Sequence, residues 1–304
     1  MSCNYQQIVV IGSGRVASRA LQAVVCASRP TAVVAVEPEA PLTEAFSATC
    51  RTHSIAYSRL PGRNALIQFF DLRSANTLII SAHNVFLFPA AMVADGRFTI
   101  VNFHNSLLPR HRGRNAPSWT IFEQDAWAGI TWHRVTAEVD AGDVLCQRRI
   151  RPDWNETALT LTQICVDLGI GALVDMLPPL LSGSMRSYPQ DAAIEPSFHR
   201  ARDIPNQGIL DANWPLGKAW AFLRAVDFGK LPVFPPPRVK VDGREYLVTG
   251  YRLAADGRSP RDSIPVEGRE LHFQERGRTL TVALAPAGQA PMTPLNVPAI
   301  EPAA

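Results

Sequence analysis

Short apolar runs alternate with segments of helical periodicity along the first third of the chain. The strand-like runs lie at 8–12, 31–36, 54–57, 77–80 and 98–104, and the helical segments at 15–28, 41–50, 64–70 and 89–93. A continuous apolar run that ends at a glycine, as in Ile8–Gly12, is typical of a parallel strand buried on both faces. Strands separated by helices imply crossover connections, so the pattern predicts an α/β fold with a doubly wound, Rossmann-like sheet.

The pattern changes twice further along the chain. A helix at 115–123, a strand pair at 129–135 and 144–150, and a helix at 157–177 ended by Pro178-Pro179 complete the first region. After Tyr188 proline, glycine and charged residues become more frequent, and a helix at 211–226 precedes short strands at 238–241, 246–251, 270–273 and 279–283. We therefore expect an N-terminal domain over 1–188, a linker over 189–208, a smaller β-rich domain over 209–284 and a disordered Ala/Pro-rich tail over 285–304.

Composition limits the class of protein. With 304 residues, 46% hydrophobic and 19% charged, the chain is globular and can bury a large core, which excludes collagen, coiled coil and long disorder. A net charge of +3 is too small for a dedicated nucleic-acid binder. The five cysteines form no C-x-x-C pair, there is no basic leader, and no uninterrupted apolar stretch of about 20 residues occurs. We therefore expect a cytoplasmic protein without a disulfide framework or membrane span.

One candidate site is the glycine turn Gly12-Ser-Gly14-Arg-Val-Ala17, which follows the first strand and opens a helix. Glu37 ends the next strand. Glycines at this place allow a pyrophosphate to approach a helix N-terminus, and an acid one strand on binds ribose hydroxyls. An NAD-binding oxidoreductase is therefore one hypothesis. The alternative is that any doubly wound sheet needs small residues in its first tight turn.

The second candidate site combines Asn102 and His104 with Asp140. Side chains two residues apart on a strand share a face, so Asn102 and His104 lie together at the carboxyl edge of the sheet, where ligands bind in open α/β folds. Asp140 is followed by Ala141 and Gly142, which suits a tight turn that holds a carboxylate. A carboxamide and an imidazole can bind a developing oxyanion, although a lone Asn-x-His pair is more often structural.

These residues carry a family resemblance. The motif Asn102-x-His104-x-Ser-Leu-Leu-Pro109, followed by Gly113, Gly129-Ile-Thr-Trp-His133 and Val139-Asp-Ala-Gly142, resembles the 10-formyltetrahydrofolate-dependent formyltransferases over residues 8 to 185. That family formylates methionyl-tRNA, glycinamide ribonucleotide, nucleotide-linked amino sugars, and amino-acid or hydroxylamino-acid units of peptide natural products. Residues 209–225 resemble the start of the family's small barrel-like C-terminal domain, whereas 232–237 depart from its usual turn.

The resemblance implies both a donor and a set of catalytic residues. Asn102, His104 and Asp140 match the family's catalytic positions, with Asn102 and a protonated His104 as donors to the formyl oxygen and Asp140 as acceptor of the amine proton. The co-substrate is 10-formyltetrahydrofolate, and no metal is implied. The expected donor contacts are Val85, Phe86, Leu87, Ser106 and Val139. His83 and Asn84 depart from the family pattern beside them. The glycine turn then belongs to the fold.

Charge separates the acceptor classes. Residues 190–304 hold 14 basic and 13 acidic residues, and 37–44 are acidic where tRNA-formylating relatives are basic. We therefore expect a small-molecule amine, either an amino-sugar nucleotide or an amino-acid or hydroxylamino-acid unit of a peptide natural product. Nucleic acid and membrane are not expected, and a homodimer is allowed. Methionyl-tRNA formyltransferase, formyltetrahydrofolate hydrolase and an NAD-binding oxidoreductase remain alternatives. His111, among Arg110, Arg112 and Arg114, lies in a loop that binds an anion or is solvated, and a structural role is favoured for His133.

Overall fold

The structure is a computed structural model that describes residues 3–27, 32–38, 43–73, 76–153, 155–255 and 269–287. The chain divides into two compact units. The first unit consists of Met1–Arg114, Gly129–Ile150 and Ile164–His199, and the second of Asn115–Ala128, Arg151–Gln163 and Arg200–Ala304. Two segments that we expected in the N-terminal domain, 115–128 and 151–163, therefore group with the second unit.

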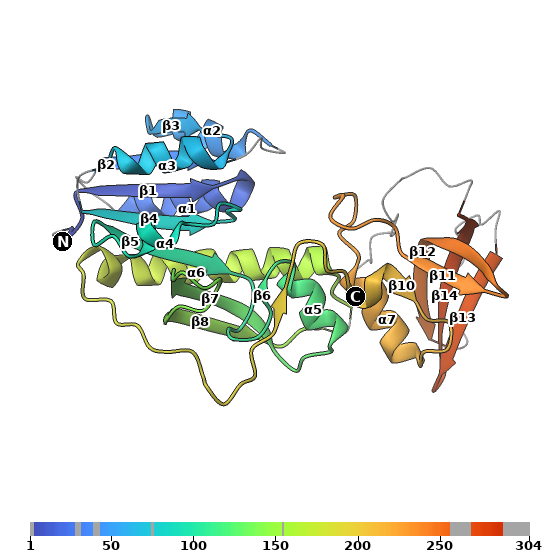
Figure 1. The fold of residues 1–304 in the computed structure, drawn as a ribbon. Helices are drawn as coiled ribbons and strands as arrows, with labels where there is room; N and C mark the ends of the chain where they lie inside the picture. The colour runs from blue at the N-terminus through green and yellow to red at the C-terminus, as the bar shows by residue number, and fades with distance from the viewer. Residues whose placement is uncertain are drawn as a thin grey trace. The chain divides into compact units, whose positions relative to one another are not determined.

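The first unit is built on a seven-stranded sheet with the order β3-β2-β1-β4-β5-β7-β8 (Figure 1). The strands are β1 Gln7–Gly12, β2 Ala32–Glu37, β3 Ala56–Arg59, β4 Thr77–Ala82, β5 Phe98–His104, β7 Ala128–Arg134 and β8 Val144–Ile150. The neighbouring strands β3 and β2, β2 and β1, β1 and β4, and β4 and β5 pair in parallel, and β7 pairs antiparallel with β5. The first five predicted strands occur within two residues of their expected places, which confirms the α/β class.

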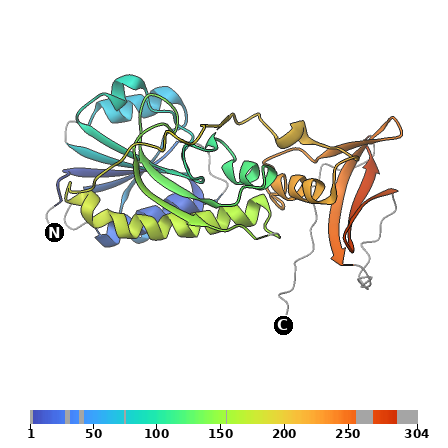
Figure 2. The same ribbon diagram turned by 90° about the horizontal axis from the view of Figure 1, so that it is seen from below.

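Helices cover both faces of this sheet. They are α1 Gly14–Ala27, α2 Ala45–Thr52, α3 Arg63–Asp71, α4 Ala90–Val93 and α6 Ala158–Leu181. Figure 2 shows α1 and α6 side by side on one face, and an Arg19–Asp167 ion pair joins them. On the other face, alternate residues of β1 such as Val9 and Ile11 pack against Leu66 and Phe70 of α3. The side-chain period of two therefore divides each buried strand between two helical layers.

Helix α6 differs from its prediction at its C-terminal end. We expected the helix to stop before Pro178, but it continues through both prolines to Leu181. A proline removes one backbone hydrogen bond and does not forbid a helical φ, and here the loss falls in the last turn. Leu180 and Leu181 are buried, so packing retains this turn, and Gly183 follows it with φ +73°.

By length and composition alone, α6 is a helix that could cross a membrane, with a hydropathy of 1.8 over its most apolar window. Polar residues such as Asp167 and Asp175 interrupt this helix, so it contains no uninterrupted apolar stretch of the kind considered in the sequence. Gly169 packs closely on the Phe103 ring, and Cys165 lies against the Gly129 carbonyl oxygen. Packing of this kind on the sheet accounts for the buried face of α6, which makes up 44% of that window.

The second unit contains a five-stranded sheet with the order β10-β11-β12-β14-β13. Its elements are α5 Ala116–Phe122, the 3-10 helix η1 Pro205–Gly208, β10 Ile209–Leu210, α7 Leu216–Ala225, β11 Arg238–Val241, β12 Arg244–Ala255, β13 Arg269–Glu275 and β14 Arg278–Pro286. Among the described residues this sheet does not close, so the expected barrel-like form is not confirmed. Helix α7 starts five residues later than expected because Pro215 directly precedes it in an extended conformation.

Two further expectations concern the ends of this region. Strand β14 extends to Pro286, so the predicted tail begins too early at 285; residues 288–304 lie outside the described residues. The predicted linker contains β9 Phe198–His199, which pairs in parallel with β6 Arg112–Gly113 in the first unit. The first part of the predicted linker, up to His199, therefore belongs to the first unit.

Candidate active site

Strand pairing brings the predicted site residues together. Asn102 and His104 end β5, and the antiparallel register with β7 places Asn102 opposite His133. Asp140 lies in the turn after β7 with a left-handed φ of +51°. A Cβ at Gly142 would lie 1.9 Å from the Arg134 carbonyl oxygen, so the turn needs a glycine there. The turn therefore returns the carboxylate to the end of β5.

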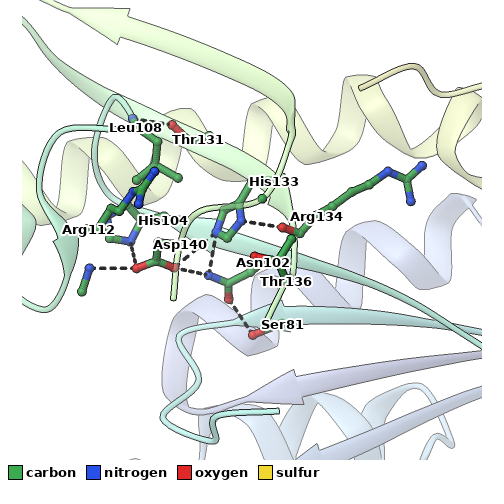
Figure 3. A network of polar contacts seen from close by, with 12 residues as sticks. Ser81, Asn102, His104, Leu108, Arg112, Thr131, His133, Arg134, Thr136 and Asp140 are labelled. Atoms are coloured by element: carbon green, nitrogen blue, oxygen red, sulfur yellow. Dashed lines mark hydrogen bonds and ion pairs between the residues drawn. The ribbon is translucent and has the colours of Figure 1, made fainter. Parts of the chain in front are cut away.

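Three side chains meet at this place (Figure 3). Asn102 Nδ2 lies 3.4 Å from Asp140 Oδ1, and His104 Nδ1 lies 3.4 Å from Asp140 Oδ2. The side chains of His104 and Asp140 are only 8% and 10% exposed. The carboxamide, imidazole and carboxylate thus form one sheltered polar cluster at the carboxyl edge of the sheet.

Asp140 is held as a carboxylate by donors on several sides. Gly113 N donates to Oδ2 at 2.8 Å, and His133 Nε2 lies 3.3 Å from Oδ1. Burial by itself raises the pKa of Asp140, but the positive charge that His104 carries when it is protonated, the hydrogen bond from His133 and the N–H of Gly113 outweigh it. Together they hold the pKa of Asp140 well below its usual range, so the group is ionised at neutral pH.

His104 lies between two oxygen acceptors. Its Nε2 is 2.8 Å from the His111 carbonyl oxygen, and its Nδ1 faces Asp140. Burial lowers the pKa of His104, and the positive charge of His133 acts in the same direction, whereas Asp140 and the His111 carbonyl oppose the shift without cancelling it. In the neutral ring the hydrogen is on Nε2, and the lone pair of Nδ1 faces the carboxylate, so the two acceptors together attract a proton to this place.

His133 belongs to the same network, although the sequence favoured a structural role. Its Nδ1 lies 2.9 Å from the Arg134 carbonyl oxygen, which can only accept, so Nδ1 carries a hydrogen. Its Nε2 lies 3.2 Å from Asn102 Nδ2 and 3.3 Å from Asp140 Oδ1. The signal that could have found His133 is its place at the end of the motif Gly129-Ile-Thr-Trp-His133 in a predicted strand; its position opposite Asn102 comes from the structure.

Comparison with known proteins identifies the family. The family model described as "Formyl transferase" matches residues 7–177, more than half of the chain. The chain belongs to the formyl transferase family. A curated relative, the GDP-perosamine N-formyltransferase of Brucella melitensis, is 32% identical over 171 residues, which cover 56% of this chain. The match spans 63% of the length of that relative.

Solved structures of formyl transferases share the fold of the chain. One is the N-formyltransferase of Helicobacter canadensis in complex with folinic acid and dTDP-3-aminofucose, with a TM-score of 0.69, 14% identity and coverage of 91% of this chain and 99% of that one. Another is a 4-N formyltransferase from Francisella tularensis, with a TM-score of 0.66, 18% identity and coverage of 80% and 96%. At these identities the likeness concerns the fold alone.

The loop after β4 carries three of the expected contacts to the formyl donor. Val85 and Leu87 are exposed, whereas the Phe86 ring is buried. Its centroid lies 5.2 Å from that of Phe88 and 6.4 Å from that of Phe70. The loop thus presents backbone and aliphatic side chains around one anchored aromatic residue. The register between β4 and β5 places Ser81 opposite Asn102, which brings the start of the loop to the site.

The other two expected donor contacts differ in their accessibility. The Ser106 hydroxyl donates to the Arg110 carbonyl oxygen at 2.6 Å and is 2% exposed, so it is engaged within the protein. Val139 is half-buried next to Asp140. Both residues stay predictions as donor contacts.

The glycine turn that follows β1 is closed by contacts within the protein. A Cβ at Gly12 would lie 1.8 Å from the Ala82 carbonyl oxygen, and the N–H of Ser13 donates to the His83 carbonyl oxygen at 3.2 Å. The Glu37 side chain is fully buried and accepts a hydrogen bond from Tyr57. Tight packing against β4 therefore explains the glycine, and Glu37 is not accessible to a ribose.

The basic loop is less solvated than one of our two hypotheses assumed. Arg112 donates to Glu138 and to Gln190, at 2.8 Å in each case. His111 is 1% exposed, and its Nδ1 lies 3.1 Å from His199 Nε2. The solvated alternative is therefore wrong for His111, which belongs to the interior of the first unit.

Proposed function

We propose that this protein is an N-formyltransferase that moves a formyl group from 10-formyltetrahydrofolate to the amine of a nucleotide-linked amino sugar. The contact of Asn102 and His104 with Asp140, together with the loop after β4 whose Val85 and Leu87 side chains are exposed, carries the proposal. Membership of the formyl transferase family and the match to a sugar N-formyltransferase support it.

The amino-sugar acceptor is favoured over the other amines by the relatives. The relatives include a GDP-perosamine N-formyltransferase and a sugar 3-N-formyltransferase whose crystal structure was determined in the presence of dTDP, and the Helicobacter canadensis enzyme is in complex with dTDP-3-aminofucose. Amino-acid or hydroxylamino-acid units of peptide natural products stay an alternative acceptor. The weak net charge of +3 argues against a tRNA.

The reaction needs a donor for an oxyanion and an acceptor for a proton. The lone pair of the amine forms a bond to the formyl carbon, the bond from that carbon to N10 breaks, the amine loses one proton and N10 gains one. Asn102 Nδ2 lies 3.4 Å from Asp140 Oδ1 and 3.2 Å from His133 Nε2. An N–H that donates to the formyl oxygen as negative charge develops there therefore exchanges one of these partners for it. A donor in this role is worth about 3 kcal/mol of transition-state stabilisation.

Asp140 and His104 act together as the proton acceptor in this proposal. His104 Nε2 faces the His111 carbonyl oxygen, so the proton that Asp140 receives can be shared with the free Nδ1 of His104. The other role that the family resemblance implies for His104, a charged donor to the formyl oxygen, requires its ring to leave the His111 carbonyl oxygen.

The remaining features of the proposal come from the sequence. We propose no metal, because the carboxamide, imidazole and carboxylate supply the chemistry that formyl transfer needs. The cytoplasmic location and a homodimer stay predictions.

The test is a panel of amines incubated with the full chain and 10-formyltetrahydrofolate and analysed by mass spectrometry. The panel contains nucleotide-linked amino sugars, ornithine, hydroxyornithine and charged tRNA. We expect a formylated amino sugar, and loss of about 100-fold in kcat when Asp140 is replaced by asparagine. Release of formate with water alone would instead identify a hydrolase, and binding of NAD without formyl transfer would identify an oxidoreductase.

A further inference from the structure

Ser81 and Asn84 form a hydrogen-bond chain that leads from the 85–87 loop to Asn102. Asn84 Nδ2 donates to Ser81 Oγ at 3.2 Å, and Ser81 Oγ donates to Asn102 Oδ1 at 2.7 Å. Ser81 is 1% exposed, at the end of β4. Figure 3 shows its hydroxyl directed at the Asn102 carboxamide.

The direction of this chain follows from the chemistry of its groups. The Phe86 N–H donates to Asn84 Oδ1 at 2.9 Å, which fixes the oxygen end of the Asn84 amide. Asn84 Nδ2 can therefore only donate, and Ser81 Oγ must accept from it. The single hydroxyl hydrogen of Ser81 is then free to be given to Asn102 Oδ1.

The hydrogen-bond chain from Asn84 through Ser81 allows only one favourable orientation of the Asn102 carboxamide. With Oδ1 bonded to Ser81, Nδ2 points to Asp140 Oδ1 and His133 Nε2. A rotation by 180° would place Oδ1 against the Asp140 carboxylate, where two acceptors repel. Ser81 on one side and Asp140 on the other therefore select the same orientation, with the N–H groups facing the site.

Asn84 also holds the loop backbone. In addition to accepting from Phe86 N, its Nδ2 donates to the Phe86 carbonyl oxygen at 3.1 Å. Phe86 lies between the exposed Val85 and Leu87. One side chain thus connects the loop expected to contact the donor with the carboxamide expected to bind the formyl oxygen.

We propose that Ser81 and Asn84 are positioning residues for formyl transfer: Ser81 orients the Asn102 carboxamide, and Asn84 couples that orientation to the 85–87 loop. This inference rests on the proposed function of the site. Neither residue needs to touch a substrate, because each acts through Asn102 or through the loop backbone.

Two variants separate the parts of this proposal kinetically. In Ser81→Ala, Asn102 Oδ1 loses its donor while the loop clamp is intact, so we expect kcat to fall about tenfold with the KM for 10-formyltetrahydrofolate unchanged. In Asn84→Asp, a carboxylate of nearly the same size accepts the Ser81 hydrogen and cannot donate to Phe86 O. We expect this variant to lower kcat and also to raise the KM for the donor.

Matched controls make the same chemical changes at exposed positions. Ser184 and Asn64 are exposed, so Ser184→Ala and Asn64→Asp should keep kcat and KM within twofold of wild type. A Ser81→Ala enzyme with kcat within twofold of wild type would overturn the positioning role of Ser81. An Asn84→Asp enzyme with an unchanged donor KM would overturn the coupling to the loop.

A second measurement does not depend on activity. The side-chain amide signals of Asn102 in an NMR spectrum of the full chain are assigned by their loss in Asn102→Ala. We expect these signals to shift in Ser81→Ala and Asn84→Asp and not in the two controls. If they stay in place, the hydrogen-bond chain is wrong even where kcat falls. If the Asn102 signals shift in a protein that transfers no formyl group, the hydrogen-bond chain is supported and the proposed function is wrong.

Discussion

Single residues with unusual backbone conformations hold the candidate site together. Asp140 has a φ of +51°, and Gly113, whose N–H donates to Asp140, has a φ of +91°. Positive φ values cost an ordinary residue about 1 kcal/mol or more, and they persist where surrounding contacts require them. Here the contacts are those that aim one carboxylate at the end of β5.

Gly113→Ala tests this requirement. A Cβ at Gly113 would lie 2.2 Å from the His199 carbonyl oxygen, so the backbone must move and carry its N–H away from Asp140. We expect a lower melting temperature and a fall in kcat of at least tenfold, measured by calorimetry and steady-state kinetics. Gly96→Ala is the matched control, because a Cβ there has open space around it. Wild-type stability and activity in Gly113→Ala would contradict the prediction.

The pH dependence of activity tests the protonation of His104. Because burial lowers the pKa of this imidazole below its ordinary 6.5, the ring stays neutral at pH values where a free histidine is already charged. With a neutral ring as partner of the base, kcat/KM should stay constant from pH 8 to below 6.5 and then fall as the ring takes up a proton. An increase of kcat/KM on acidification through this range would indicate a charged His104 as donor instead.

At the scale of elements, Gln190, in the segment before β9, connects the Asp140 turn to the segment that contains Arg112. Gln190 Nε2 donates to the carbonyl oxygens of Asp140 and Gly142, at 2.7 and 3.0 Å, and its Oε1 accepts from Arg112. No motif in the sequence pointed to Gln190 as a site residue, because it lies in a predicted linker 50 positions from Asp140.

Gln190→Ala should loosen the Asp140 turn. Two carbonyl oxygens lose their donor, and we expect kcat to fall about tenfold and the amides of 140–143 to exchange hydrogen faster in mass-spectrometric exchange experiments. Gln68→Ala, at an exposed position of α3, is the control. If exchange in the 140–143 turn is the same in both variants, Gln190 does not hold it.

The same elements show what a sequence can predict. The strands of the first sheet were predictable because continuous burial on both faces leaves an apolar run that local reading detects. The end of α6 was not, because the packing of Leu180 and Leu181 outweighs the loss of hydrogen bonds at two prolines. His133 and Gln190 were missed as site residues because their partners are distant in sequence.

At the scale of the whole molecule, the charge is close to balanced. The net charge is +3, and several arginines at the surface are paired with carboxylates, such as Arg19 with Asp167 and Arg148 with Asp175. A protein that binds a polyanion needs unpaired cations that release counterions on binding. These paired arginines agree with the small acceptor that we propose.

Formyl transfer should accordingly depend weakly on salt. We expect kcat/KM to change less than about tenfold between about 50 and 200 mM salt, whereas six or more phosphate contacts would lower affinity by about 10³-fold or more. The measurement is the initial rate at a subsaturating acceptor concentration across this range. A decline of the steeper kind would support a tRNA acceptor.

The sequence by itself determined the α/β class and the alternation of strands and helices, and its motifs selected Asn102, His104 and Asp140 as candidate site residues, because local periodicity and short motifs carry that information. Only the tertiary structure decided how these groups are oriented. The directed chain from Asn84 through Ser81, the place of His133 between Asn102 and Asp140, and the hold of Gln190 on the Asp140 turn each depend on hydrogen bonds across strands and turns. The geometry of such bonds is fixed by packing and register, which no single stretch of sequence contains.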